Sequence, residues 1–328
     1  MEHLLQDKAN ELIRIYKLVN KDYRWKNSSN VNNLIALSYV MKGRAYNKAE
    51  IDRVNDYIKK NTGPFSCYRQ KSILYSVLLL LNYSDPEAKF DILLDYEDRL
   101  KSSGFKSYTY RPVTAYTLLL TCRSAEIDQR LAKAHQLFVE MRRNHPWLTS
   151  GDDYPLSILM AKEKESVSQI MKNIENIYSE LHEAGFSKSN GLQFLSHILS
   201  FSSENTSEKV LRCKKLYDFF KDNKLKVYSS NYGALGLLTL LKGKSDEAAR
   251  DTIGISRVIS EEKGLKWLGK ETIFLTSSSL VCDYFLESMK NREVIETTAF
   301  ITMEALLAAQ TAAMLGATCA ASAAASGS

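Results

Sequence analysis

The feature that most constrains the fold of this 328-residue chain is a sequence pattern that recurs about every forty residues. Each unit contains a short uncharged segment, a break rich in Ser, Thr or Asp, a longer charged segment, and a turn containing Gly or Asn. The pattern restarts at an aromatic residue or Leu, at spacings of 43, 38, 39 and 40 residues: Phe105, Leu148, Phe186, Leu225 and Leu265. A fixed period of this length indicates a repeat architecture.

The longer segment of each unit has the periodicity of an amphipathic helix. In residues 167–184 the apolar side chains recur at steps of three and four, as a helix with one buried face requires. These side chains are Val167, Ile170, Ile174, Ile177, Leu181 and Ala184. Ser84 and Glu87 predict a capping box at the start of another such helix, and Gly104 predicts its end.

The shorter segments, such as residues 72–81 and 233–241, are apolar on every side, which predicts burial between neighbours. Alternating strands and helices are the competing interpretation, but these runs lack the β-branched residues typical of core strands. The chain also has only 14 Gly and 5 Pro, too few for a turn-rich β-sandwich or barrel. We therefore predict an all-α fold, an α-solenoid of six or seven antiparallel helical hairpins with a repeat of about 40 residues.

The C-terminal segment differs from the repeats in composition. We expect residues 1–315 to form a single helical-repeat domain and residues 316–328 to be a small-residue tail, docked or disordered. Small residues occupy every fourth position, at Ala308, Ala312, Gly316, Ala320 and Ala324. This spacing lets two helix backbones approach closely, so self-association through the Ala-rich helix is one hypothesis. The segment is too weakly hydrophobic to predict a membrane span.

The net charge of +6 is concentrated in the first 70 residues, which hold 13 basic and 7 acidic side chains. Aromatic residues, among them Tyr23 and Trp25, interleave with these charges. A basic, aromatic-rich surface is typical of nucleic-acid or polyanion binding. The modest charge of the whole chain favours the alternative, an ordinary solvated helical face.

No familiar catalytic or cofactor motif is present. The five cysteines are far apart, and no Cys or His pair has metal-ligand spacing, so neither a metal nor a cofactor is expected. Gly243-Lys244-Ser245 resembles the end of a phosphate-binding loop, but Leu238 replaces the first glycine. We assign no catalytic residue. Unpaired thiols and a charged N-terminus without an apolar stretch predict a cytoplasmic protein.

The candidate site is the row of loops that lead into the short apolar helices. In a solenoid these loops would align along one edge, where helix N-termini and basic side chains favour anionic groups. The predicted partner-binding residues are Arg69, Tyr110, Arg111, Asp152, Asp153, Tyr154, Asn190, Asn231 and Tyr232. The expected partner is a protein or peptide, with nucleic acid as a less favoured alternative.

A structural interpretation of the same loops stays open. Ser, Asp and Asn are common helix N-caps, and the Tyr side chains could staple the turns. Asp152 and Asp153 are the exception, because two adjacent carboxylates exceed what one cap needs. They support a third hypothesis, an enzyme of unrecognised class, although no partner His or third carboxylate can be identified.

The segment from Leu148 to Leu156, the run Ile158-Leu159-Met160-Ala161 and the Ala-rich C-terminus resemble an uncharacterised bacterial family of similar length. This resemblance covers nearly the full chain. It implies a cytoplasmic bacterial protein and transfers no catalytic residue. The recurring hairpins are also similar to HEAT and tetratricopeptide arrays, without the 34-residue period of the latter.

Overall fold

The computed structural model describes residues 3–265 and 268–290. In these ranges the chain forms fifteen α-helices, short 3-10 helices and no β-strand, so the predicted all-α class is confirmed. The alanine ladder from Ala308 to Ala324 and the tail 316–328 lie outside the described residues, and what we expect of them stays a prediction.

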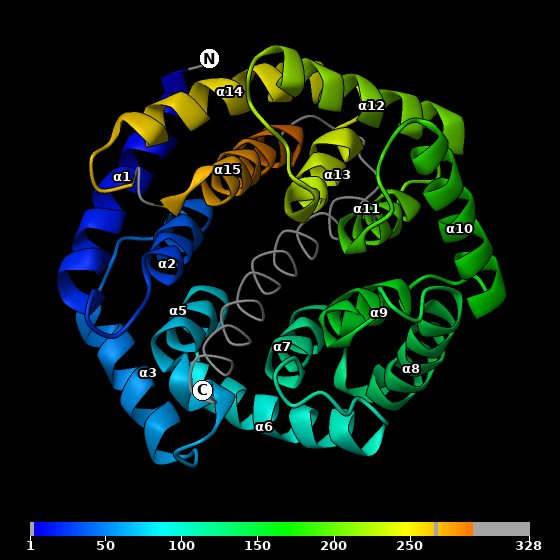
Figure 1. Cartoon of the computed structure of the whole chain (residues 1–328). Coiled ribbons are helices and arrows are strands. Elements are labelled where there is room, and N and C mark those ends of the chain that lie inside the picture. Colours follow the sequence, from blue (N-terminus) through cyan, green and yellow to red (C-terminus); the bar gives the residue numbers. More distant parts are fainter. Residues whose placement is uncertain (1–2, 266–267, 291–328) are drawn as a thin grey trace, which may run out of the picture.

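The helices form two concentric layers around one axis (Figure 1). The outer layer contains α1 (His3–Tyr23), α3 (Lys48–Lys60), α6 (Pro86–Ser102), α8 (Ile127–Asn144), α10 (Val167–Glu183), α12 (Thr206–Asp222) and α14 (Ser245–Glu261). The inner layer contains α2 (Ser29–Met41), α5 (Ser72–Asn82), α7 (Arg111–Thr121), α9 (Tyr154–Met160), α11 (Asn190–Ser200), α13 (Tyr232–Leu240) and α15 (Lys270–Lys290). Each outer helix packs against the inner helix that follows it in the chain.

Short elements lead into several of the inner helices. They are α4 (Cys67–Gln70), η2 (Gly151–Asp153) and η3 (Ser229–Asn231), while η1 (Ser124–Glu126) leads into the outer helix α8. Each is a single turn that lets the chain change direction between layers.

The two layers follow from the two kinds of sequence segment. Outer helix α10 buries one stripe, from Ile170 through Ile174 and Ile177 to Leu181, and exposes the opposite face. Inner helix α5 buries every residue from Ser72 to Leu81. A helix that is apolar all round is stable only when it is covered on all sides, so such segments occupy the inner layer.

The two ends of the row of hairpins meet and close a ring. Helix α1 packs against α14 and α15, and α2 packs against α15. Polar contacts cross this junction: Lys8 Nζ lies 3.1 Å from Asp283 Oδ2, Lys17 Nζ lies 3.1 Å from Glu262 Oε2, and Asn33 Nδ2 donates to Thr276 Oγ1 at 2.7 Å. Segments more than 240 residues apart in sequence therefore share one core.

The predicted cap of α6 is wrong by one residue. Asp85, not Ser84, is the N-cap, and its side chain accepts from the backbone N–H of Ala88 at 3.1 Å. Pro86 fixes the first helical position, which places the cap on the residue directly before it. The predicted end at Gly104 agrees with the structure, since Gly104 has a φ of 97° and the N–H of Phe105 donates to Leu100 O.

Across the described ranges, none of the helices combines the length and the apolar character that a membrane crossing requires.

Candidate functional site

The loops that lead from outer to inner helices lie on one face of the ring, because the chain runs in opposite directions in the two layers (Figure 1). We call these loops the N-rim, since they hold the N-terminal ends of the inner helices. They are residues 24–28, 61–66, 103–110, 145–153, 184–189, 223–231 and 262–265. All nine predicted site residues lie in the N-rim or in the first turns of the helices that follow it.

Hydrogen bonds join consecutive N-rim loops. Tyr108 OH donates to Phe65 O at 2.8 Å and accepts from the N–H of Cys67 at 3.2 Å. One loop further on, the N–H of Ser107 donates to Tyr154 OH at 3.2 Å. Each tyrosine therefore fixes the position of the loop before its own, which makes this part of the rim a connected surface.

The second half of the N-rim is joined in a similar way. Gln193 Nε2 donates to Thr149 Oγ1 at 2.8 Å, and Asn231 Nδ2 donates to Glu271 O at 3.0 Å. Gly191 approaches the next loop so closely that a Cβ there would lie 2.0 Å from Ser229 O. Neighbouring loops are thus held together in pairs.

The two predicted arginines, Arg69 and Arg111, both donate hydrogen bonds to backbone carbonyl groups of the chain. Arg69 Nη1 donates to Thr62 O at 3.0 Å and also to Lys59 O, so it caps the C-terminal end of α3. Arg111 is buried; its Nη1 donates to Lys106 O at 3.1 Å, and its Nε lies 3.5 Å from Glu97 Oε1. Arg111 is therefore closed off from solvent, whereas Arg69 is half-buried and makes both of these hydrogen bonds through Nη1.

Asp152 and Asp153 both contact Ser150. The N–H of Ser150 donates to Asp153 Oδ2 at 3.0 Å, and Ser150 Oγ donates to Asp152 Oδ1. Burial, with a smaller contribution from the charge of Asp152, raises the pKa of Asp153 to about 8. A carboxyl with this pKa is suited to general acid chemistry, but the contacts around it are those of a helix cap.

Among the remaining predicted residues, the three tyrosine rings are packed against neighbouring groups, and the Asn190 side chain is exposed. Tyr154 is buried between Phe105 and Phe138, and Tyr232 is buried against Phe186. Tyr110 is half-buried, and its ring packs on the backbone of Gly151, where a Cβ would lie 2.5 Å from Tyr110 Cδ2. Asn190 is exposed at the start of α11. The structure brings these residues together in pairs on adjacent loops and not into one pocket.

None of the four most exposed aromatic side chains of the N-rim was a predicted site residue, although the sequence places Trp25 in the basic, aromatic-rich N-terminal region. Trp147 is 95% exposed, Trp25 87%, Phe65 83% and Tyr108 46%. These are all the exposed large aromatic side chains in the described part of the chain, and they lie in four consecutive loops. Their common position, a few residues after an outer helix ends, was the available signal.

A family model described as "Protein of unknown function (DUF4003)" matches residues 15–312. The chain belongs to the DUF4003 family. The uncharacterized protein YeaA of Bacillus subtilis (strain 168) is 27% identical over 319 residues, which cover 95% of this chain and 94% of that protein. These matches confirm the resemblance to an uncharacterised bacterial family. No solved structure matches the chain.

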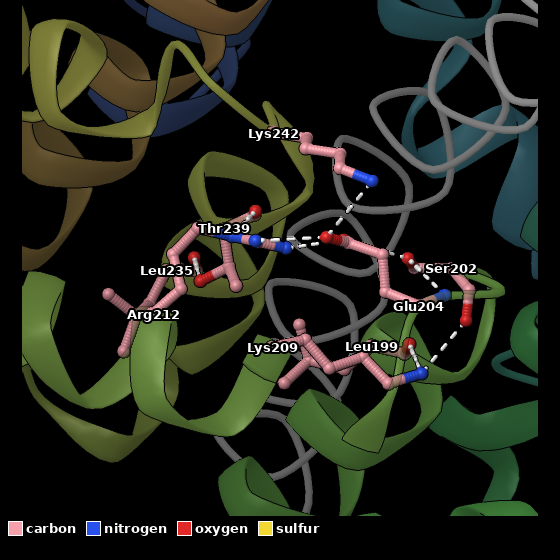
Figure 2. Close-up of polar contacts among 8 residues, drawn as sticks. All are labelled: Leu199, Ser202, Glu204, Lys209, Arg212, Leu235, Thr239 and Lys242. Atoms are coloured by element: carbon pink, nitrogen blue, oxygen red, sulfur yellow. Dashed lines mark hydrogen bonds and ion pairs between the residues drawn. The ribbon is translucent and has the colours of Figure 1, made fainter. Parts of the chain in front are cut away.

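The opposite face of this DUF4003 chain, which we call the C-rim, carries the C-terminal ends of the inner helices. Its most connected group surrounds Glu204 (Figure 2). Arg212 donates to both Glu204 oxygens, at 3.1 and 2.5 Å, and Lys242 Nζ lies 3.4 Å from Oε1. Burial is the largest single influence and opposes ionisation of Glu204, but the hydrogen bonds and charge of Arg212, the Ser202 hydrogen bond and the charge of Lys242 together keep the pKa of Glu204 below its usual value.

Lys209 belongs to the same group and is almost completely buried (Figure 2). Its Nζ donates to Leu199 O at 2.9 Å and to Ser202 O at 2.8 Å, at the C-terminal end of α11. Burial lowers the pKa of Lys209 to about 8. Lysines with lowered pKa can act as nucleophiles, but this amine is directed at two backbone carbonyls, which indicates a helix cap.

A third polar group lies between α8, α10 and α11. His145 Nε2 lies 3.0 Å from Glu175 Oε2, and Asn144 Nδ2 donates to Glu175 Oε1 at 3.2 Å. Burial lowers the pKa of the nearby His197 to about 3, so this imidazole is neutral. In the residues that the structure describes, no three His, Cys, Asp or Glu side chains are grouped so that they could hold a metal ion.

Proposed function

We propose that this DUF4003 chain is an interaction protein whose N-rim binds a protein or peptide partner. The observation that carries the proposal is the row of exposed aromatic side chains at Trp25, Phe65, Tyr108 and Trp147. Large aromatic side chains left in water lose the free energy that burial would supply, and Trp and Tyr supply much of the binding energy at protein interfaces.

The N-rim also has the rigidity that a binding surface needs. The hydrogen bonds of Tyr108 and Tyr154 fix the spacing of three adjacent loops before any partner arrives. A preformed surface loses less conformational entropy on binding than a set of independent loops. In this proposal, buried residues such as Arg111 and Asp153 support the loops, and the exposed rings make the contacts.

We further infer that the ring is a closed α-solenoid of seven hairpins with a repeat of about 40 residues. Support comes from the alternation of outer and inner helices and from three loops that begin alike. At Gly104, Gly185 and Lys224 the chain leaves an outer helix in the left-handed conformation, and the next residue is Phe105, Phe186 or Leu225. A cytoplasmic location is part of the proposal, since the four described cysteines form no disulfide with one another.

The test compares peptide affinity in two variants that remove exposed apolar side chains from different places. Trp147→Ser/Phe65→Ser removes two rings from the N-rim. Leu211→Ser, the matched control, removes a side chain that is 71% exposed on outer helix α12, away from that rim. We expect peptides selected on the wild-type protein from a random library to lose at least about tenfold in affinity for the double variant and to keep their affinity for the control.

Other results would reject the N-rim proposal or favour one of the two alternative functions. Equal losses in both variants, or none in either, would reject the N-rim as the binding surface. A selected ligand rich in acidic groups, with affinity that falls steeply between low and high salt, would favour the polyanion alternative through Arg24 and Lys26, which flank Trp25. The enzyme alternative at Asp152 and Asp153 predicts a catalytic activity that Asp153→Asn abolishes without unfolding the chain.

A further inference from the structure

A cavity of about 320 Å³ lies where α12 ends and the chain turns towards η3. It is lined by Tyr217, Lys221, Lys224, Lys226 and Val227. Tyr217 and Val227 contribute apolar side chains to the lining, and the other three lining residues are lysines. The lining therefore combines apolar surface with three positively charged residues.

The three lysines form no ion pair within the described part of the chain, unlike Lys214 and Lys215, which lie about two turns before Lys221 on α12. Lys214 Nζ lies 2.5 Å from Asp218 Oδ2, and Lys215 Nζ lies 2.6 Å from Asp246 Oδ2. Asp222, directly after Lys221, pairs with none of the three. Within the described residues none of the three lysines has a carboxylate partner, and Lys226 Nζ lies 4.6 Å from the centre of the Tyr228 ring.

The backbone at Lys224 adds a second, independent observation. Lys224 has a φ of 60°, in the left-handed region, whereas Gly104 and Gly185 occupy the same position after α6 and α10. The hydrogen bonds agree, since Leu225 N–H donates to Phe220 O as Phe105 N–H donates to Leu100 O. Lysine is less stable than glycine in this conformation, so its side chain is placed at the cavity at a conformational cost.

We propose that this cavity binds a phosphate monoester attached to an apolar body. Three lysines suit a ligand with two negative charges better than a ligand with a single carboxylate. Lysine binds phosphate as a point charge, without the planar, two-pronged geometry of an arginine guanidinium. The phosphate would lie among Lys221, Lys224 and Lys226, and the attached group would pack on Tyr217 and Val227. A small phosphorylated molecule and a phosphorylated tyrosine side chain share this chemistry. The proposal does not depend on partner binding by the aromatic N-rim.

The experiment is calorimetric titration of the full chain with phenyl phosphate, inorganic phosphate and benzoate. We expect phenyl phosphate to bind at least about tenfold more tightly than benzoate, and its affinity to fall as salt screens the lysines. Lys221→Ala/Lys226→Ala should weaken phenyl phosphate by about tenfold or more. Lys188→Ala, which removes an exposed lysine from the preceding N-rim loop, is the matched control and should bind as the wild type does.

Lys224→Gly separates binding from folding. This variant restores the residue found at the two equivalent positions, so its thermal midpoint should equal or exceed that of the wild type while phenyl phosphate binding weakens. Tighter binding of a phosphotyrosine peptide than of free phosphotyrosine would identify a modified protein as the source, and equal binding would identify a small molecule. No saturable binding of phenyl phosphate, or equal loss in Lys188→Ala, would overturn the proposal. Trp147→Ser should leave the affinity for phenyl phosphate unchanged, whether or not the N-rim binds a partner.

Discussion

At the scale of single residues, charged side chains in the N-rim loops and in the first turns beside them make hydrogen bonds and ion pairs that hold the local backbone. Asp153 accepts from Ser150, Arg69 caps α3, and Arg111 is buried beside Glu97. The same is true of Lys209, which sequence reasoning did not select. Capping groups and ligand-binding groups are the same residue types, and only their measured contacts separate the two roles.

The first prediction concerns Asp153, whose folded-state pKa of about 8 lies above the ordinary value of 3.8. Between these two values the unfolded chain has released the proton that the folded chain keeps, so stability falls as pH rises, by at most about 1.4 kcal/mol per pH unit. Asp153→Asn removes this loss. We therefore expect the variant's stability relative to wild type to be higher at pH 8 than at pH 4, measured by urea unfolding.

Asp128→Asn is the control for Asp153, because it makes the same substitution at a side chain that is 89% exposed. A difference between Asp153→Asn and wild type that stays constant from pH 4 to pH 8 would show that Asp153 ionises in the folded protein as it does in the unfolded chain.

The second prediction concerns Lys209. Lys209→Met keeps the buried aliphatic stem but leaves Leu199 O and Ser202 O without their donor, and we expect a loss of about 2–4 kcal/mol in the free energy of unfolding. Lys215→Met removes the same charge from an exposed pair with Asp246 and should cost about 0.5 kcal/mol or less. Urea unfolding of both variants checks this, and similar values would argue against a capping role.

At the scale of elements, the fold depends on how closely successive inner helices approach. Helices α11 and α13 pack side by side, and the start of α11 meets the 3-10 turn that precedes α13. At this point the backbones touch without a side chain between them, which is why Gly191 is required there. The aromatic pairs Phe105–Tyr154 and Phe186–Tyr232 fill the equivalent junctions between outer-helix ends and inner-helix starts.

The third prediction tests this close approach. A Cβ at Gly191 would lie 2.0 Å from Ser229 O, a backbone atom that cannot rotate away. Gly191→Ala should therefore destabilise the chain by about 2–3 kcal/mol. Gly63→Ala, at a position with nothing within 4 Å, should stay within about 0.5 kcal/mol of wild type. Thermal or urea unfolding of the two variants distinguishes a steric clash with Ser229 O from a general effect of replacing glycine by alanine.

At the scale of the whole molecule, closure of the ring joins the two ends of the described chain. In an open array each terminal hairpin has one neighbour and frays independently. Here α1 and α2 have α14 and α15 as neighbours as well, through Lys8–Asp283, Lys17–Glu262 and Asn33–Thr276. Loss of packing in α1 or α2 should therefore also destabilise α14 and α15.

The fourth prediction uses Leu12, which is fully buried in α1. Leu12→Ala should cost about 2–5 kcal/mol and accelerate hydrogen exchange in α14 and α15 together with α1. Leu137→Ala, at a buried position in α8, is the control and should act first on α8 and α9. Unchanged protection of α14 and α15 in Leu12→Ala would show that the junction contributes little to stability.

Local sequence patterns suffice to predict the all-α class and the two kinds of helix. Helical periodicity and the placement of breakers are local properties, so the stripe of α10, the all-round burial of α5 and the helix end at Gly104 could all be predicted. The cap at Asp85 was missed because Ser84 and Asp85 are both good caps, and Pro86 decides between them only through its fixed φ.

Closure of the row of hairpins and the exposure of individual N-rim side chains depend instead on packing between segments far apart in the sequence. Trp147 and Tyr154 are aromatic residues at the same end of one hairpin, yet Trp147 is 95% exposed and Tyr154 is 4% exposed. Their sequence contexts do not separate them, because exposure depends on whether a neighbouring hairpin covers the ring. Burial of this kind is a long-range property, and it is what distinguishes the residues that hold the loops from those available to a partner.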